Sequence, residues 1–410
     1  MEFPLKRLAP AGNALSLPSI FRMLYLKDPP DDLLVSVLAS SSYYCFSSGT
    51  AALYVALASL KKHSRKREVI IPAYSCPSLV AATVRAGLEP VLCDLEEKWF
   101  RMDLTKAASL MGNDTLAVIA VHLLGLPERL DALRDLARER NVFLIEDAAQ
   151  AFGNHFQGGD TPLCNGGKPL GTWGDLAIFS FGRGKPLSLL RGGSIVVSNP
   201  SVDPLIHEEY SRLPSGDSLR DSLAYLLSLV LYSLFFRPPL YWIPESMPWL
   251  GLGKTIFHPD FKVHKNNRFV TRLMGTFCGS FNDLRELRLA LTRRYRELLA
   301  PLSPRIAYPG EDETCGNALL RFPVVLEGKG MRDRVLSMLK GAGTGAAESY
   351  PVPLNELPGA RDHIANRHSR FPHAKAISER MITLPLHEYV TDGHARLIAR
   401  LVREAVEETS

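Results

Sequence analysis

The stretch VFLIEDAAQAFG, residues 142–153, decides the fold because it joins an apolar run to a group of polar residues. Valine, phenylalanine, leucine and isoleucine in succession are typical of a strand that is buried on both faces, as in a parallel sheet. Two carboxylates and an amide follow at Glu146, Asp147 and Gln150. Ligands bind at the carboxyl ends of the strands in open α/β sheets. The stretch therefore predicts a parallel strand with a ligand site at its end.

The same pattern recurs on both sides of this stretch, between about residues 40 and 200. Short apolar runs predict further strands at 43–46, 68–72, 89–94, 116–122, 176–181 and 193–198. Amphipathic stretches predict helices at 50–62, 77–87 and 129–141. Alternating strands and helices are typical of an open sheet covered by helices. We therefore predict an α/β fold with a mostly parallel central sheet.

Beyond residue 280 the pattern changes to that of a smaller α+β domain. A charged amphipathic helix is predicted at 284–302, a strand at 319–328, and further helices at 331–341 and 394–407. We expect a large domain over residues 1–265, with an apolar insertion around 222–258. The smaller C-terminal domain is expected over residues 266–410.

The composition is that of a well-packed globular protein, which excludes disordered, collagen-like and disulfide-stabilised classes. The chain has 410 residues, of which 46% are hydrophobic and 22% charged, enough to bury a sizeable core. Its 48 Lys+Arg and 43 Asp+Glu leave a net charge of only +5. Because the basic residues are scattered, we expect no nucleic-acid partner.

The cysteines and the N-terminal stretch bear on the cellular compartment. The six cysteines share no C-x-x-C spacing and do not cluster with histidines; they are Cys45, Cys76, Cys93, Cys164, Cys278 and Cys315. This pattern favours free thiols in a reducing cytosol and indicates no metal site. The N-terminal stretch lacks the continuous apolar segment and cleavage site of a signal peptide, so we expect a cytoplasmic protein.

Three predicted strand ends carry residues that could bind a ligand or take part in catalysis. SSGTAAL, residues 47–53, leads from a strand into a helix, where Gly49 and Thr50 can hold a phosphate; a plain helix cap is the alternative. Asp147 is a buried charge in need of a cationic partner, or else a helix N-cap. Lys185 follows FSFGRG, whose glycines let a ligand approach the backbone. It is a candidate amine nucleophile unless it is simply solvated.

Taken together, these residues meet the needs of pyridoxal phosphate. This cofactor needs an amine to bond with, an anion site for its phosphate, and a carboxylate beside the pyridine nitrogen so that the ring acts as an electron sink. Lys185 offers the amine and Asp147 the carboxylate. Ser180, Gly49 and Thr50 offer the anion site. All five residues follow or end strands of the same predicted sheet.

The order of the motifs resembles that of a known enzyme family. SGTAAL, HLLGLP, LIEDAAQAFG, GDLAIFSF with Lys185 behind it, and GGSIVV resemble the DegT/StrS-type sugar aminotransferases, fold type I enzymes that use pyridoxal phosphate. The resemblance runs from about residue 40 to 200 and resumes at 264–300 and 345–400. It implies that Lys185 is the Schiff-base lysine, which also moves the proton between substrate and cofactor.

The resemblance also implies roles for other residues. Asp147 would pair with the pyridine nitrogen and Gln150 would lie near the ring hydroxyl. Ser180, Gly49 and Thr50 would contact the phosphate. Asn266, in a segment similar to the family's N-x-R segment, would reach the cofactor phosphate of the neighbouring subunit. We therefore expect a homodimer with shared active sites.

Some positions depart from the family or allow two interpretations. His122 and Gly125 match an H-x-x-G step, where the histidine either positions a ligand or is buried and structural. After the segment P-A-Y-S, Cys76 stands where the family has an aromatic residue that stacks on the cofactor ring. Stacking is then weaker, or comes from Tyr74 or elsewhere, and we expect both Tyr74 and Cys76 to line the cofactor. An extra glycine-rich loop at 155–172 is expected to border the substrate.

We therefore predict an aminotransferase that moves an amino group, from glutamate, onto a keto group of a nucleotide-activated sugar, as in polysaccharide biosynthesis. The lysine at position 185 disfavours the related dehydratases, in which histidine replaces it. Two alternatives remain. One is an enzyme that acts on a lipid-linked or hydrophobic substrate at a membrane surface, and the other is a catalytically idle partner protein. No helix-turn-helix or basic stripe supports DNA regulation.

One segment, SLAYLLSLVLYSLFFRPPLYWI at residues 222–243, is far more apolar than the rest of the chain. Its uncharged run Leu223–Phe236 has 14 residues, fewer than the ~20 that a membrane-spanning helix needs. The following Arg-Pro-Pro stops the helix. Three roles remain open for the segment: packing within the dimer, peripheral contact with a membrane, and lining an apolar substrate channel.

Overall fold

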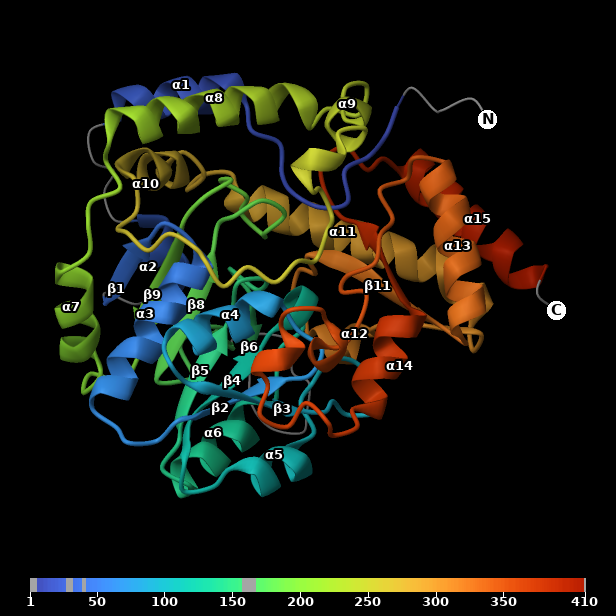
Figure 1. Ribbon diagram of the computed structural model, residues 1–410. Helices are drawn as coiled ribbons and strands as arrows, with labels where there is room; N and C mark the ends of the chain where they lie inside the picture. The colour runs from blue at the N-terminus through green and yellow to red at the C-terminus, as the bar shows by residue number, and fades with distance from the viewer. Residues whose placement is uncertain (1–5, 27–31, 39–41, 157–166, 409–410) are drawn as a thin grey trace.

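The computed structural model describes residues 6–26, 32–38, 42–156 and 167–408 (Figure 1). Seven strands form the central sheet in the order β1-β9-β8-β5-β4-β2-β3. They are β1 (Tyr43–Phe46), β2 (Glu68–Pro72), β3 (Glu89–Cys93), β4 (Thr115–Val121), β5 (Phe143–Asp147), β8 (Leu176–Ser180) and β9 (Gly193–Val197). Each coincides with a predicted apolar run to within one residue at either end, because these runs are the segments that both faces of the sheet can bury.

The sheet is mostly parallel, as predicted. Strands β3, β2, β4, β5 and β8 run parallel as neighbours. Only β9 reverses, and it pairs antiparallel with both β8 and β1. In β4 every residue is buried, which explains why its sequence is a continuous apolar run rather than an alternating one.

Helices cover both faces of this sheet. The helices are α3 (Gly49–Lys62), α4 (Pro77–Arg85), α5 (Leu104–Leu110), α6 (Leu130–Glu139) and α7 (Asp203–Ser211). Side chains of α3 and α4 share one core cluster with Ala117 and Ile119 of β4. Side chains of α5 and α6 share another with Val118 and Ala120. Successive residues of one strand thus point to opposite faces, as the pleat requires.

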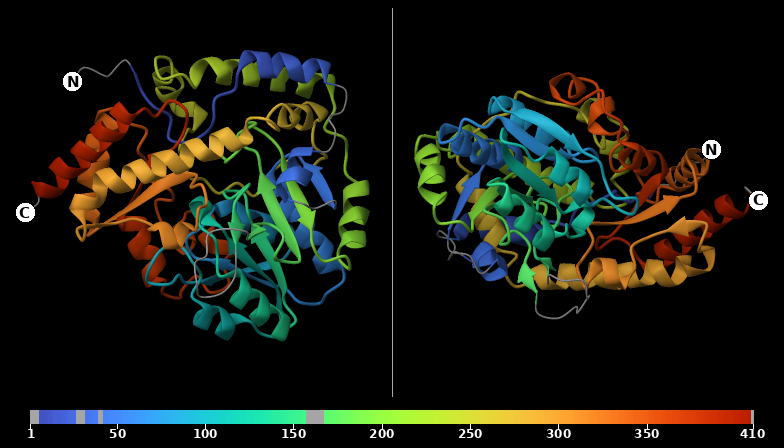
Figure 2. Two further views of the ribbon diagram at one scale, coloured as in Figure 1. Left: turned by 180° about the vertical axis from the view of Figure 1, so that it is seen from behind. Right: turned by 90° about the horizontal axis from the view of Figure 1, so that it is seen from below.

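A second, antiparallel sheet follows the long helix α11 (Phe281–Leu299), which runs from the central sheet to it (Figure 2). Its strands are β10 (Ile306–Ala307), β11 (Arg321–Leu326) and β12 (Met381–Pro385), in that order. The helices of this part are α12 (Glu311–Thr314), α13 (Lys329–Gly341), α14 (Pro372–Arg380) and α15 (Asp392–Glu407). The sequence analysis did not predict β12, although the smaller α+β unit itself was expected.

Short elements complete the description. The two-stranded sheet of β6 (His155–Phe156) and β7 (Lys168–Pro169) lies at the ends of the glycine-rich loop. Single-turn helices are η1 (Leu123–Gly125), η2 (Pro248–Leu250), η3 (Ala300–Leu302), η4 (Leu354–Glu356) and η5 (Arg361–His363). Helix α2 (Asp32–Leu38) stands near the N-terminus.

The chain passes between the two units more than once. Helix α10 (Arg268–Gly275) buries Val270 and Leu273 in the core cluster that also contains Phe179 of β8. The N-terminal segment reaches the smaller unit, where the Leu8 amide donates to the Gly343 carbonyl at 2.9 Å. The domain boundary between residues 265 and 266 stays a prediction.

The apolar block forms α8 (Leu219–Phe235) and α9 (Trp242–Glu245). Helix α8 lies side by side with α1 (Leu17–Tyr25) on the outside of the molecule (Figure 1). Leu223, Leu227 and Leu231 are 57%, 60% and 43% exposed. Their spacing of four residues places them on one face; we call them the leucine ridge. No helix in the described ranges is long and apolar enough to cross a membrane.

Candidate active site

Asp147, Ser180 and Lys185 lie at the carboxyl ends of two neighbouring parallel strands. Asp147 ends β5 and Ser180 ends β8. The Asp147 side chain is 9% exposed and accepts a hydrogen bond from the Ala149 amide at 3.0 Å. Burial raises the pKa of the Asp147 carboxyl, while the nearby ammonium group of Lys185 opposes that rise. The structure therefore brings the predicted amine and carboxylate together.

The start of α3 lies against the ends of β8 and β9. Ser48 caps the helix, accepting a hydrogen bond from the Ala51 amide at 3.1 Å. A side-chain carbon on Gly49 would stand 2.8 Å from the Ser180 Cβ, and one on Gly193 would stand 2.3 Å from the Gly49 nitrogen. Only glycine allows this approach. The first-turn amides, which have no acceptor within the helix, can then meet an anion beside Ser180.

Gln150 meets a residue that the sequence analysis did not single out. Its Oε1 accepts from the Leu124 amide at 3.0 Å, and its Nε2 donates to the Tyr350 hydroxyl at 3.2 Å. Burial raises the pKa of the Tyr350 hydroxyl well above its usual value, helped by the neighbouring Cys76 and Asp147. Tyr350 therefore extends from the smaller unit into the group of predicted site residues.

Tyr74 holds Tyr350 in place. The Tyr74 hydroxyl donates to the Tyr350 carbonyl and accepts from the Tyr350 amide, both at 3.1 Å. The two rings meet edge to face, 5.5 Å apart. Two aromatic rings thus stand near Cys76, where the sequence analysis expected stacking from Tyr74 or elsewhere. No short-range signal identifies Tyr350, because 276 positions separate it from Tyr74.

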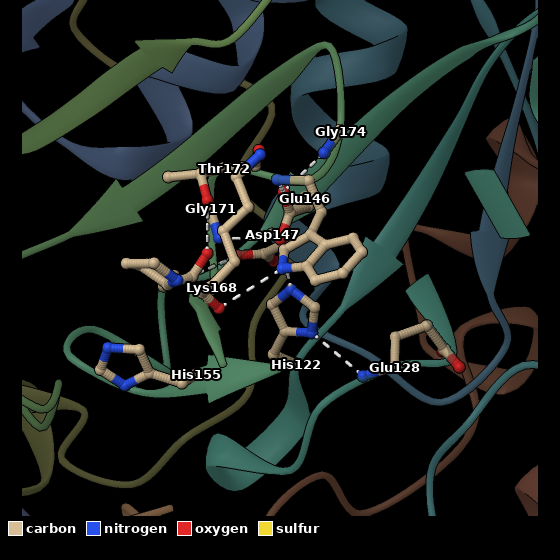
Figure 3. Close-up of polar contacts among 12 residues, drawn as sticks. His122, Glu128, Glu146, Asp147, His155, Lys168, Gly171, Thr172 and Gly174 are labelled. Atoms are coloured by element: carbon tan, nitrogen blue, oxygen red, sulfur yellow. Dashed lines mark hydrogen bonds and ion pairs between the residues drawn. The ribbon is translucent and has the colours of Figure 1, made fainter. Parts of the chain in front are cut away.

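His122 belongs to a structural network rather than to an open site (Figure 3). Its Nε2 lies 3.1 Å from Glu146, and its Nδ1 accepts from the Glu128 amide at 3.1 Å. Glu146 also accepts from the backbone amides of Gly171, Trp173 and Gly174 at 2.6–2.7 Å. Both imidazole nitrogens are thus engaged, which favours the buried, structural interpretation.

The backbone turn at Gly125 also leaves no freedom in the choice of residue. Gly125 has φ +92°, and a side-chain carbon there would stand 2.8 Å from the Ala318 carbonyl. Both the backbone conformation and the space therefore require glycine. Residues 157–166, most of the loop expected to border the substrate, lie outside the described residues.

A buried arginine fixes the backbone next to Lys185. Arg288, only 2% exposed, donates to the Pro186 carbonyl at 2.8 Å, to Gly12 at 3.4 Å and to Leu386 at 3.3 Å. Burial lowers the pKa of its guanidinium to about 10. One side chain thereby ties the lysine loop to the N-terminal segment and to the smaller unit. The sequence carries no signal for this role.

Asn266 lies beside the start of α3 within its own chain. Its amide donates to the Cys45 carbonyl at 3.0 Å, and its side chain donates to the Thr271 hydroxyl at 3.4 Å. It lines a cavity of about 290 Å³ together with Ser48 and Arg191. The predicted cross-subunit role of Asn266 stays a prediction.

The structure describes several of the cysteines and the side chains that could bind a metal ion. Cys45, Cys76 and Cys93 carry free thiols, while Cys164 lies outside the described residues. Within the described ranges, no group of histidine, cysteine, aspartate and glutamate side chains could hold a metal ion.

Comparison with known proteins matches this arrangement to one family. The model of the DegT/DnrJ/EryC1/StrS aminotransferase family matches residues 39–209 and 279–403, more than half of the chain. The GDP-perosamine synthase of Escherichia coli O157:H7 is 33% identical over 162 residues, 39% of this chain and 42% of the synthase. The chain thus matches about two fifths of the length of that relative. UDP-N-acetyl-3-dehydro-alpha-D-glucosamine 3-aminotransferase of Acidithiobacillus ferrooxidans is 23% identical over 88% of this chain and 83% of its own.

Solved structures show the same fold. PseC of Helicobacter pylori, an aminotransferase, has a TM-score of 0.75 at 17% identity and covers 98% of this chain and 100% of its own. Spr1654 of Streptococcus pneumoniae, solved in a PLP form, has a TM-score of 0.74 at 19% identity, with coverage of 98% and 100%. The family match leaves residues 1–38 and 210–278 unmatched, and these contain α1 and α8.

Proposed function

Because the chain belongs to the DegT/DnrJ/EryC1/StrS aminotransferase family, we propose that it is a pyridoxal-phosphate-dependent aminotransferase. It moves an amino group, from glutamate, onto a keto group of a nucleotide-activated sugar. The observation that carries the proposal is that the Lys185 ammonium group lies near enough to the buried Asp147 to lower its pKa, at the sheet edge where α3 begins. The relatives include a GDP-perosamine synthase and a UDP-sugar aminotransferase, which supports the substrate class.

The residues fit the cofactor. A carboxylate as buried as that of Asp147 is stable as an anion only beside a cation, which a protonated pyridine nitrogen supplies. Gly49, Thr50 and Ser180 form an anion cradle that any larger residue at position 49 would fill. When bound, pyridoxal phosphate acts as the electron sink for carbon–hydrogen cleavage next to an amine. Gln150 would lie at the ring edge.

The protein's own residues perform the proton transfer and control access. The Lys185 Nζ takes a proton from the α-carbon of the amino donor and returns one to the acceptor carbon. Arg288 holds the backbone next to Lys185 through its hydrogen bond to the Pro186 carbonyl. Tyr74 and Tyr350 place two aromatic rings, 5.5 Å apart, beside the site.

Absorbance spectroscopy tests this proposal. The purified protein, given pyridoxal phosphate, should turn yellow and retain the cofactor covalently after borohydride reduction. Lys185→Ala should abolish that linkage, whereas Lys340→Ala, an exposed lysine on α13, should keep it. Glutamate should bleach the visible band, and a nucleotide-linked keto sugar should restore it. A protein that takes up no pyridoxal phosphate is instead the catalytically idle partner, and the proposal fails.

We also propose that the active sites are shared in a homodimer through Asn266. A mixture of Lys185→Ala and Asn266→Ala chains tests this. If Asn266 serves the neighbouring site, mixed dimers contain one intact site, and an equimolar mixture recovers about a quarter of wild-type activity from random pairing in a twofold dimer. If Asn266 serves its own chain, no activity returns.

We further propose a cytoplasmic location with peripheral membrane contact through residues 222–243. The leucine ridge supports this, because exposing apolar side chains to water is unfavourable unless another surface covers them. Flotation with anionic vesicles tests the contact. Binding that is unchanged after Leu223→Ser and Leu227→Ser rules out the ridge as the contact.

A further inference from the structure

A groove of about 540 Å³ lies between α8, the segment that follows it, the N-terminal segment and the loop that carries Lys185. Most of its lining side chains are apolar, among them Leu231, Phe235 and Met247. Its volume falls within the range of small-molecule sites. The groove therefore offers space for an apolar chain next to the candidate active site.

Two arginines interrupt the apolar lining. Arg183 and Arg191 both line the groove, and both come from the loop around Lys185. Among the residues that the structure describes, no carboxylate forms an ion pair with either, and the guanidinium of Arg191 stands 5.5 Å from the Tyr225 ring centre. Guanidinium groups bind phosphate oxygens through paired hydrogen bonds. A groove that joins apolar walls to two such arginines complements an amphiphile with a phosphate head.

A third arginine connects this groove to the cofactor site. Tyr241 lines the groove, and burial raises its pKa to about 12, while the charges of Arg183 and Arg321 oppose that rise. Burial lowers the pKa of the Arg321 guanidinium to about 10, and Tyr241 and Tyr74 oppose that fall. Its Nη2 donates to the Thr383 carbonyl at 3.2 Å, but its buried Nε has no hydrogen-bond partner among the described residues. Arg321 thus lies near both Tyr241 of the groove and Tyr74 of the candidate active site.

The groove also adjoins the leucine ridge. Leu231 belongs to both, because it lines the groove and is 43% exposed. A chain that lies in the groove can therefore leave it over the apolar face of α8. The family match includes Arg183 and Arg191 but leaves α8 and the N-terminal segment unmatched, so most of the apolar wall of the groove lies outside the family model.

We propose that the groove binds a lipid diphosphate, so that the acceptor is a keto sugar joined through a diphosphate to a long apolar carrier. The chain lies against α8, the diphosphate meets Arg183 and Arg191, and the sugar points toward Tyr74 and Lys185. This inference rests on the proposed aminotransferase function and extends its acceptor class from a nucleotide carrier to a lipid carrier.

Calorimetric titration of the pyridoxal-phosphate-loaded protein tests the groove. Farnesyl diphosphate is the probe, with pyrophosphate, farnesol and UDP compared at the same ionic strength. Farnesyl diphosphate should bind at least about tenfold more tightly than pyrophosphate or farnesol, which equals about 1.4 kcal/mol. Equal affinity for pyrophosphate, or tighter binding of UDP, would overturn the lipid assignment.

Variants locate the binding. Arg183→Gln with Arg191→Gln should weaken farnesyl diphosphate binding about tenfold or more. Leu231→Asp should weaken farnesyl diphosphate but not pyrophosphate. Arg220→Gln, an exposed arginine on α8 outside the groove, should bind as the wild type does. Unchanged affinity in the double variant contradicts the proposal.

Two further measurements separate this proposal from its alternatives. The visible band and its bleaching by glutamate are recorded for each variant, so loss of the cofactor reports failure of the proposed function rather than of the groove. Light scattering records the mass. If Leu223→Lys with Leu227→Lys converts a dimer to monomers, a second copy of the chain covers the ridge, and the lipid assignment is overturned.

Discussion

The end of β5 buries charged side chains, whereas the outer face of α8 exposes apolar ones; each is the reverse of the usual arrangement. β5 ends in two buried carboxylates, and α8 exposes Leu219 and the three leucines of the ridge. Glu146 receives three backbone amides and His122 from within the protein, so its burial is compensated. Asp147 receives one amide. The comparison teaches that a buried carboxylate with few hydrogen-bond partners, like an uncovered apolar face, marks a place where the protein meets another molecule.

The two regions also differ in how they relate to the family. Residues around Asp147 and Lys185 fall within the matched range 39–209, whereas α8 falls within the unmatched residues 210–278. The chemistry is therefore placed on the shared fold. The apolar wall that would select a carrier lies mostly on unmatched residues, while Arg183 and Arg191 lie in the matched range.

The largest effect is expected on the turnover number when the charge of Asp147 is removed. Asp147→Asn keeps the shape of the side chain but removes the charge that holds the pyridine nitrogen protonated. The turnover number should fall roughly 100- to 1,000-fold, as for loss of a preorganised electrostatic contact. Steady-state assays measure it, with Asp135→Asn, an exposed residue of α6, as the control. Activity within twofold of wild type would show that Asp147 needs no cationic ligand.

A pH effect is expected at His387, which joins the unmatched N-terminal segment to the smaller unit. Its Nε2 lies 2.9 Å from the Ala9 carbonyl, and burial lowers its pKa to about 4. Between pH 6.5 and 4 the unfolded chain therefore binds more protons than the folded one, so stability falls as the pH falls. The loss amounts to about 3 kcal/mol over this window.

Urea unfolding at a series of pH values measures that loss. His387→Gln should flatten the dependence between pH 6.5 and 4, while His63→Gln, on the surface at the end of α3, should leave it as in the wild type. An equally steep dependence in His387→Gln would assign the effect to other groups.

A smaller effect is expected from the contact between the two units at Tyr350. Tyr350→Phe removes the hydroxyl that accepts from Gln150 but keeps the ring. It should cost about 1 kcal/mol of stability and shift the visible band of the bound cofactor. Thermal unfolding and absorbance report the two changes, and Tyr54→Phe on α3 is the control. No spectral shift would place Tyr350 outside the cofactor's surroundings.

The smallest effect on stability is expected on the leucine ridge. Helix α8 itself offers the comparison, because it carries both exposed and buried leucines. Leu223→Ala should change the free energy of unfolding by less than ~0.5 kcal/mol, as surface substitutions do. Leu229→Ala, at a fully buried position of α8, should cost about 3 kcal/mol. Urea unfolding of both variants measures the difference. A large cost for Leu223→Ala would mean that the ridge is packed rather than exposed.

The sequence was informative where local pattern and chemistry coincide. The strands of the central sheet are continuous apolar runs, and their boundaries follow from which residues both faces can bury. Because parallel strands end at one edge, the same runs predict that Asp147, Ser180 and Lys185 gather there. The small residues around Gly49, at the start of a helix, indicate an anion site at the same edge.

Other residues carry no such local signal. Tyr350 and Arg288 act through partners more than a hundred positions away in the chain, and only packing of the two units brings them to the site. For His122, the sequence allowed a positioning role and a structural one; the partners of its two ring nitrogens, Glu146 and the Glu128 amide, distinguish them.

The sequence by itself determined the order of the strands along the chain, the edge at which the polar residues gather and the family to which the motifs belong. These follow from the period of apolar residues and from the residue types that each chemistry needs. Only the tertiary structure decided which side of α8 is covered and which arginines line the groove beside it. Those depend on long-range packing, because a helix with apolar residues around most of its circumference does not reveal in its sequence which face the protein buries.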